Sequence, residues 1–127
     1  MIFIPDNKVC YNLEKMKNTE IEKGTAFTVV ELIEYTPNLV VSRTIMKKTT
    51  GKVTAVSYDN SEAMIGKIIP FDNFVQIIDG KAEIVIDGIS NSLDTGNSII
   101  IPAHSSNSVR PNQHFKMISI VIKSGYE

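Results

Sequence analysis

The segment spanning residues 74–88 constrains the fold more than any other part of the chain. It holds two Asp-Gly pairs, Asp79-Gly80 and Asp87-Gly88, eight residues apart. Asp-Gly supplies the two positive φ angles of a type I′ hairpin turn, so each pair predicts an antiparallel reversal of the chain. The six residues between the pairs alternate, with Ala82, Ile84 and Ile86 on one face. The segment therefore predicts neighbouring antiparallel strands.

Short runs rich in β-branched residues lie on both sides of this segment. They cover residues 28–35, 39–47 and 52–58 before it and residues 97–101 and 115–123 after it. No long segment has an apolar period of 3.6 residues, so helices are not expected. About eight short strands at regular spacing predict an all-β protein, an antiparallel sandwich or barrel.

The chain divides into two regions by composition. Residues 1–24 are rich in Glu, Lys and Asn and predict a short irregular or partly helical N-terminal arm, whereas residues 25–127 predict one barrel domain. A single cysteine, Cys10, excludes an internal disulfide and fits a reducing compartment. The N-terminus lacks the apolar run of a signal peptide, and no stretch is long enough to span a membrane. We expect a cytoplasmic protein that binds neither membranes nor, with a net charge of -1, nucleic acid.

Three stretches of the sequence point to a known family. They are IPFDNFVQIIDGKAEIVIDG, the step Gly96-x5-Pro102, and the closing run FKMISIVIK. In these features the part of the chain from residue 64 to residue 123 resembles a small single-domain cupin, of the cupin 2 conserved barrel type. The resemblance implies a jelly-roll barrel of two antiparallel sheets with a pocket between them, and it implies a homodimer.

The resemblance also places the family's metal motifs, G-x5-H-x-H-x(3–4)-E-x6-G and G-x5-P-x-G-x2-H-x3-N. Counted from Gly80 and Gly96, the four ligand positions are occupied by Lys67, Ile69, Asn73 and Asn107. A protonated lysine repels a cation, isoleucine has no donor atom, and amide oxygens are weak ligands for first-row metal ions. We therefore expect degenerate motifs, no metal and no other cofactor.

No other residues replace the lost ligands. The two imidazoles, His104 and His114, lie ten residues apart. Even together with Asp72 and Asp94 they lack the spacing of any standard metal site.

The vacated positions define a candidate pocket. Lys67, Asn73 and Asn107 would form a receptor for a carboxylate or a carbonyl group, because one cation and two amides can all donate hydrogen bonds to oxygen. The apolar candidates for the pocket wall are Ile69, Val75, Val109 and Met117, and His104 is the candidate at the rim.

Each polar candidate also has a simpler interpretation. Lys67 could extend its amine from the barrel mouth into water. His104 could be a solvated loop residue, and the two asparagines could cap their own turns.

Three classes of function remain open at this point. The first is a metal-free domain that binds or senses a small molecule. The second is a cofactor-independent isomerase or lyase that uses Lys67 or His104 as its base. The third is a degenerate cupin that acts as a protein-interaction module. We favour the first and name no catalytic residue, because no histidine–carboxylate pair inside the barrel is visible in the sequence.

Overall fold

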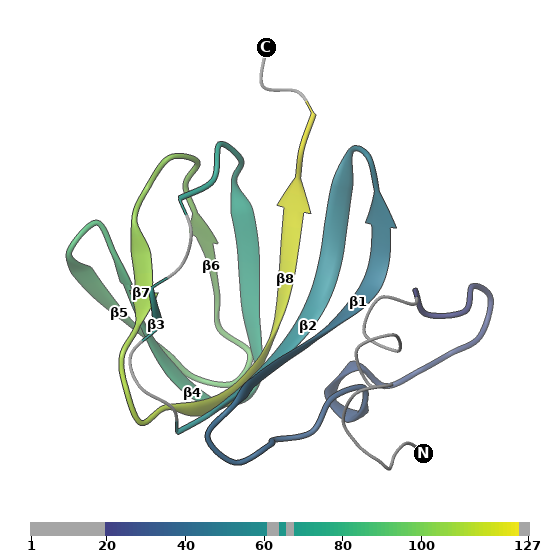
Figure 1. The fold of residues 1–127 in the computed structure, drawn as a ribbon, viewed down its shortest axis with the longest axis horizontal. Helices are drawn as coiled ribbons and strands as arrows, with labels where there is room; N and C mark the ends of the chain where they lie inside the picture. Colours follow the sequence, from purple (N-terminus) through teal and green to yellow (C-terminus); the bar gives the residue numbers. More distant parts are fainter. Residues whose placement is uncertain (1–19, 61–63, 66–67, 125–127) are drawn as a thin grey trace.

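The computed structural model describes residues 20–60, 64–65 and 68–124 (Figure 1). Within these ranges the chain forms eight strands and one turn of 3-10 helix, η1 (Val29–Glu31). The strands are β1 (Val40–Lys48), β2 (Gly51–Asp59), β3 (Met64–Ile65), β4 (Asn73–Ile86), β5 (Ile89–Leu93), β6 (Ser98–Ile101), β7 (Asn107–Val109) and β8 (His114–Ile122). The prediction of an all-β fold is confirmed. None of the helices in the described residues is long and apolar enough to cross a membrane.

The strands form two sheets that share β4. One sheet has the order β1-β2-β8-β4-β6, and the other has β3-β7-β4-β5, with every pair antiparallel. β4 passes from the first sheet to the second at a register shift between Ile77 and Asp79. This arrangement is the jelly-roll barrel of two antiparallel sheets that the resemblance implies.

The two Asp-Gly pairs have different roles in this topology. Asp87-Gly88 forms the expected turn between β4 and β5, with φ angles of 49° and 84°. The reversal predicted at Asp79-Gly80 is wrong, since both residues lie inside β4 beside the register shift. Gly80 has φ of 82°, and a Cβ at this position would collide with the carbonyl oxygen of His114 on β8. A glycine at positive φ can close a hairpin, but at Gly80 it bends a continuous strand at a bulge.

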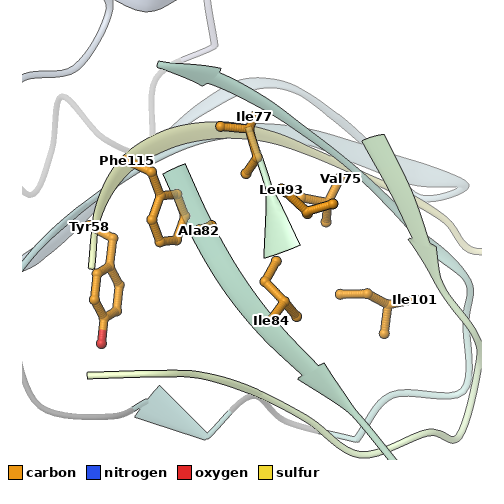
Figure 2. Close-up of a cluster of buried hydrophobic side chains, with 8 residues drawn as sticks. All are labelled: Tyr58, Val75, Ile77, Ala82, Ile84, Leu93, Ile101 and Phe115. Atoms are coloured by element: carbon orange, nitrogen blue, oxygen red, sulfur yellow. The ribbon is translucent and has the colours of Figure 1, made fainter. Parts of the chain in front are cut away.

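The core lies between the sheets and is closed at one end by two aromatic rings (Figure 2). Tyr58 and Phe115 are each 1% exposed, and their rings stack with centroids 5.3 Å apart. They lie directly opposite each other on β2 and β8. The rest of the buried cluster is aliphatic and consists of Val75, Ile77, Ala82, Ile84, Leu93 and Ile101.

The strand predicted over residues 28–35 is wrong. This part of the chain forms η1 and an irregular segment that continues to residue 39, and we call residues 28–39 the outer segment. Side chains of the first sheet bond to carbonyl groups of residues 28–35, and the backbone of β2 bonds to this segment only at its end, where Asp59 N–H donates to the Leu39 oxygen at 3.2 Å. Ser57 Oγ donates to the Glu34 oxygen (3.0 Å) and Lys116 Nζ donates to the Val30 oxygen (2.8 Å). The outer segment thus covers part of the sheet's outer face, which explains its apolar residues without a strand.

Candidate functional site

Along the strands of the first sheet, the inner side chains change from almost fully buried to half-buried. At one end lie Tyr58 and Phe115, which are almost fully buried. At the other end, near the β1–β2 turn and the end of β8, the inner positions Thr54, Asn73 and Ser119 are polar and half-buried. We call this the open end of the barrel; it lies toward the top of Figure 1.

A hydrogen bond links two of the polar residues at the open end. Ser119 Oγ donates to Asn73 Oδ1 at 2.7 Å. Asn73 is the first residue of β4, and Ser119 lies on the neighbouring strand β8. Because Oδ1 accepts from Ser119, the amide can offer a ligand its Nδ2 donors. Such donors suit a carboxylate or carbonyl oxygen.

Lys52 brings a cation to the same end, and the sequence analysis missed it. Lys52 lies on the inner side of β2, because it alternates with Thr54 and Tyr58. It is half-buried, and it faces Val121, which in turn faces Asn73 on β4. Its position follows from the alternation in the run KVTAVSY once Tyr58 is placed inside the barrel. That signal was present in the sequence.

The second sheet holds two more of the predicted pocket residues. Asn107 begins β7 and pairs with Ile86, the last residue of β4. Val109, two residues further along and therefore on the same face, is half-buried and packs against the core cluster. Asn107 is also half-buried. It therefore lies on the inner side of the second sheet.

The other predicted residues take varied places. Val75 is 0% exposed and belongs to the packed core, and Met117 packs against that core from β8. The side chain of His104 is exposed in a loop, where its backbone has φ of 66° and its N–H donates to the Ile69 oxygen at 2.8 Å. Lys67 lies outside the described residues, so its role remains a prediction.

The described residues that the motif count assigns to the metal positions, Ile69, Asn73 and Asn107, do not suit a metal ion. The part of the chain that the structure describes contains no group of three His, Cys, Asp or Glu side chains placed to hold one. Ile69 has no donor atom, and the one oxygen of Asn73 that could bind a cation accepts a hydrogen bond from Ser119.

A histidine–carboxylate pair exists in the structure, but it lies on the outer face of the sheet. His114 Nδ1 is 2.6 Å from Asp59 Oδ1, and the Tyr35 ring of the outer segment stacks on the imidazole with centroids 3.6 Å apart. The Tyr35 hydroxyl donates to Asp79 Oδ2 at 2.5 Å. Burial, followed by this hydrogen bond and the charge of Asp79, raises the pKa of Tyr35 above its ordinary value. This cluster holds the outer segment on the sheet and faces away from the open end.

Comparison with known proteins shows which solved structures have a similar fold. No model of a known protein family matches the sequence, and no curated protein matches it. A conserved protein of unknown function from Streptococcus pyogenes has a similar structure, with a TM-score of 0.74 and 25% identity over 84% of this chain and 93% of that one. A cupin superfamily protein from Desulfitobacterium hafniense has a TM-score of 0.74 and 20% identity over 84% of this chain and 97% of that one. A cupin 2 conserved barrel domain protein from Leptotrichia buccalis has a TM-score of 0.75 and 21% identity over 85% of this chain and 51% of that one.

The topology and these structural neighbours define the class. The protein is an all-β jelly roll of the cupin type. More particularly, its fold is similar to that of a cupin superfamily protein and of a cupin 2 conserved barrel domain protein. The motif count predicts that amide, ammonium and aliphatic side chains stand at the four positions where cupins hold a metal.

Proposed function

We propose that this domain binds or senses a small molecule with a carboxylate or carbonyl group at the open end of its barrel, without a metal or other cofactor. The observation that supports this most is the contrast along the inner face. Aromatic rings seal one end, while Thr54, Asn73 and Ser119 remain half-buried and polar at the other. A side chain held for packing alone would not need polar atoms in that position.

The charges at the open end favour an anionic ligand. Lys52 supplies a cation, and Asn73 supplies amide donors once its oxygen accepts from Ser119. Ammonium and amide donors together bind a carboxylate with charge-assisted hydrogen bonds. Asn107 on the opposite sheet would contact the other side of the same ligand, and Lys67 would add a second cation if the motif register holds.

Calorimetric titration with a panel of small acids tests this proposal, with acetate, pyruvate and benzoate as the first probes. Lys52→Met and Asn73→Leu should each weaken the binding of an acid by at least about tenfold, the loss expected when a charge-assisted hydrogen bond is removed. Lys81→Met is the matched control, because the Lys81 side chain is 81% exposed and pairs with Asp94 away from the open end. Equal affinity in Lys52→Met, Asn73→Leu and wild type would refute a site at this end.

The enzyme alternative has less support from the described residues. His104, one of its two candidate bases, has an exposed side chain, and the histidine with a carboxylate partner is His114 on the outer face. A base at either place would act outside the barrel. The other candidate base, Lys67, remains a prediction for this alternative as well.

A further inference from the structure

Two lysines lie opposite each other on the inner side of the first sheet at its open end. Strand pairing places Lys47 on β1 directly opposite Lys52 on β2. Directly opposite residues of an antiparallel pair share one face of the sheet, so the Lys47 side chain lies on the same inner side as Lys52. The pair is next to the β1–β2 turn, toward the top of Figure 1.

An irregularity in β1 turns Lys47 to the inner side. Thr44 lies on this side, and the register of β1 shifts between Thr44 and Met46. Strict alternation from Thr44 would put Met46 and Lys48 on the inner side, but the bulge places Lys47 there instead. Lys48 therefore lies on the outer side, where its Nζ is 3.8 Å from Glu20 Oε1.

The lysine pair is unfavourable in the free protein, because like charges directly opposite each other on neighbouring strands repel. Among the residues that the structure describes, neither ammonium forms an ion pair with a carboxylate. Asp72, just before β4, accepts a hydrogen bond from the Ala103 N–H at 2.8 Å. The whole chain has a net charge of -1, so this gathering of positive charge does not follow from composition.

The place of β1 at the edge of its sheet explains only half of the pair. Lysines on an edge strand discourage pairing with another chain, and Lys47 can have this effect. Lys52 cannot, because it lies on the next strand inward and is half-buried. Sequences keep such local conflicts mainly at functional sites. The pair therefore points to an anion that binds there.

The side chains around the pair can donate hydrogen bonds to such an anion. Hydroxyl groups occupy the next inner row on β1, β2 and β8, which consists of Thr44, Thr54 and Ser119. Asn73 lies in the same row as Lys52, beyond Val121 on β8. At about 4.8 Å per strand, the backbones of Lys52 and Asn73 are about 10 Å apart. A lysine side chain and a small ligand together can span this distance.

We propose that the ligand at the open end carries two negative charges, one bound by Lys52 and Asn73 and the other by Lys47. This inference rests on the proposed function, because it concerns the same site, and it narrows the ligand class to a small dianion. A second carboxylate or a phosphate group supplies the second charge equally well. Binding replaces the repulsion between the two ammonium groups with an ion pair at each of them.

Calorimetric titration of the full chain at an ionic strength of about 0.01 M, where charges are little screened, tests the proposal. Succinate is compared with butyrate, which has the same carbon chain length but only one carboxylate. Succinate should bind about fivefold tighter, the upper end of what one exposed ion pair contributes. Phosphonopropionate, in which a phosphonate replaces one carboxylate of succinate, tests the phosphate source. The dianion that binds tighter identifies the second group.

Two neighbouring lysines provide the variant and its matched control. Lys47→Gln removes the second cation and should bring the affinities for succinate and butyrate to within about twofold of each other. Lys48→Gln should keep the preference for succinate, because Lys48 lies on the outer side beside Glu20. Both lysines are exposed, so both variants should fold as wild type does.

The outcomes separate this inference from the proposed function on which it rests. Equal affinity of the wild type for succinate, phosphonopropionate and butyrate overturns the inference and leaves the proposed function standing. So does a preference for the dianions that Lys47→Gln leaves unchanged or that Lys48→Gln removes to the same extent. A protein that binds none of these acids, nor acetate, pyruvate or benzoate, overturns the proposed function and this inference with it.

Discussion

The hydrogen bond between Tyr35 and Asp79 offers a quantitative test of how the outer segment is held. The two oxygens are 2.5 Å apart, and the acceptor is a carboxylate. A hydrogen bond to a charged group contributes about 1.5–3 kcal/mol. Both side chains are only half-buried, so we discount this to about 1–2 kcal/mol for solvent screening. Tyr35→Phe, which keeps the ring that stacks on His114, should lower the free energy of unfolding by that amount.

Urea denaturation of wild type, Tyr35→Phe, Asp79→Asn and the double variant measures the effect. The free energy of unfolding falls by about 2 kcal/mol per molar urea, so the single Tyr35→Phe change should lower the urea midpoint by about 0.5–1 M. The double-mutant cycle should give a coupling of about 1 kcal/mol or more between the two residues. A coupling near zero would refute the view that this bond fastens the outer segment to the sheet.

The same bond predicts a distinct alkaline behaviour. Burial and the bond to Asp79 raise the pKa of Tyr35 in the folded protein. Its unfolded value is about 10, so above that pH the unfolded chain loses the phenol proton first and the folded state is destabilised. The stabilisation from Tyr35 is therefore complete below about pH 10 and declines as the pH rises further. The difference in stability between wild type and Tyr35→Phe should shrink between pH 10 and pH 11, and a constant difference would contradict this assignment.

Two further predictions concern the barrel scaffold. Gly88→Ala, at a positive φ like that of Gly80, should cost about 1 kcal/mol. Gly80→Ala should destabilise the fold by clearly more, because only there does the new Cβ meet the backbone of His114. Equal unfolding midpoints for the two variants would refute the bulge argument. Phe115→Ala should cost about 3–5 kcal/mol of stability by leaving a cavity against Tyr58. Phe27→Ala, at an exposed position, should cost less than about 1 kcal/mol. Similar decreases in the melting temperature of the two variants would contradict the closed aromatic end.

The sequence predicted most of the strands, and its errors have physical causes. The alternation in the strands around Ile84 and Met117 follows from one buried face, which is a local property and can be read directly. The bend at Asp79-Gly80 could not be told from a hairpin turn, because both need a glycine at positive φ. The difference lies in the long-range pairing of β4 with β8. Residues 28–35 have strand-like composition, but the side chains of Ser57 and Lys116 bond to their carbonyl groups, and this is visible only after folding.

The candidate site was predictable in part. Motif counting found Asn73 and Asn107, and the structure places both at half-buried inner positions. The motif count overlooked Lys52 and Ser119, because neither falls on a family motif. Strict alternation from Tyr58 and Phe115 would have identified both as inner-facing.

Heteronuclear NMR titration with pyruvate or benzoate tests the central claim most directly. The account predicts saturable shifts in the amide signals of Lys52, Thr54, Asn73 and Ser119, with the signals around Phe115 at the closed end unchanged. A response confined to the closed end, or to the outer face around Phe74, would contradict a ligand site at the open end of the barrel.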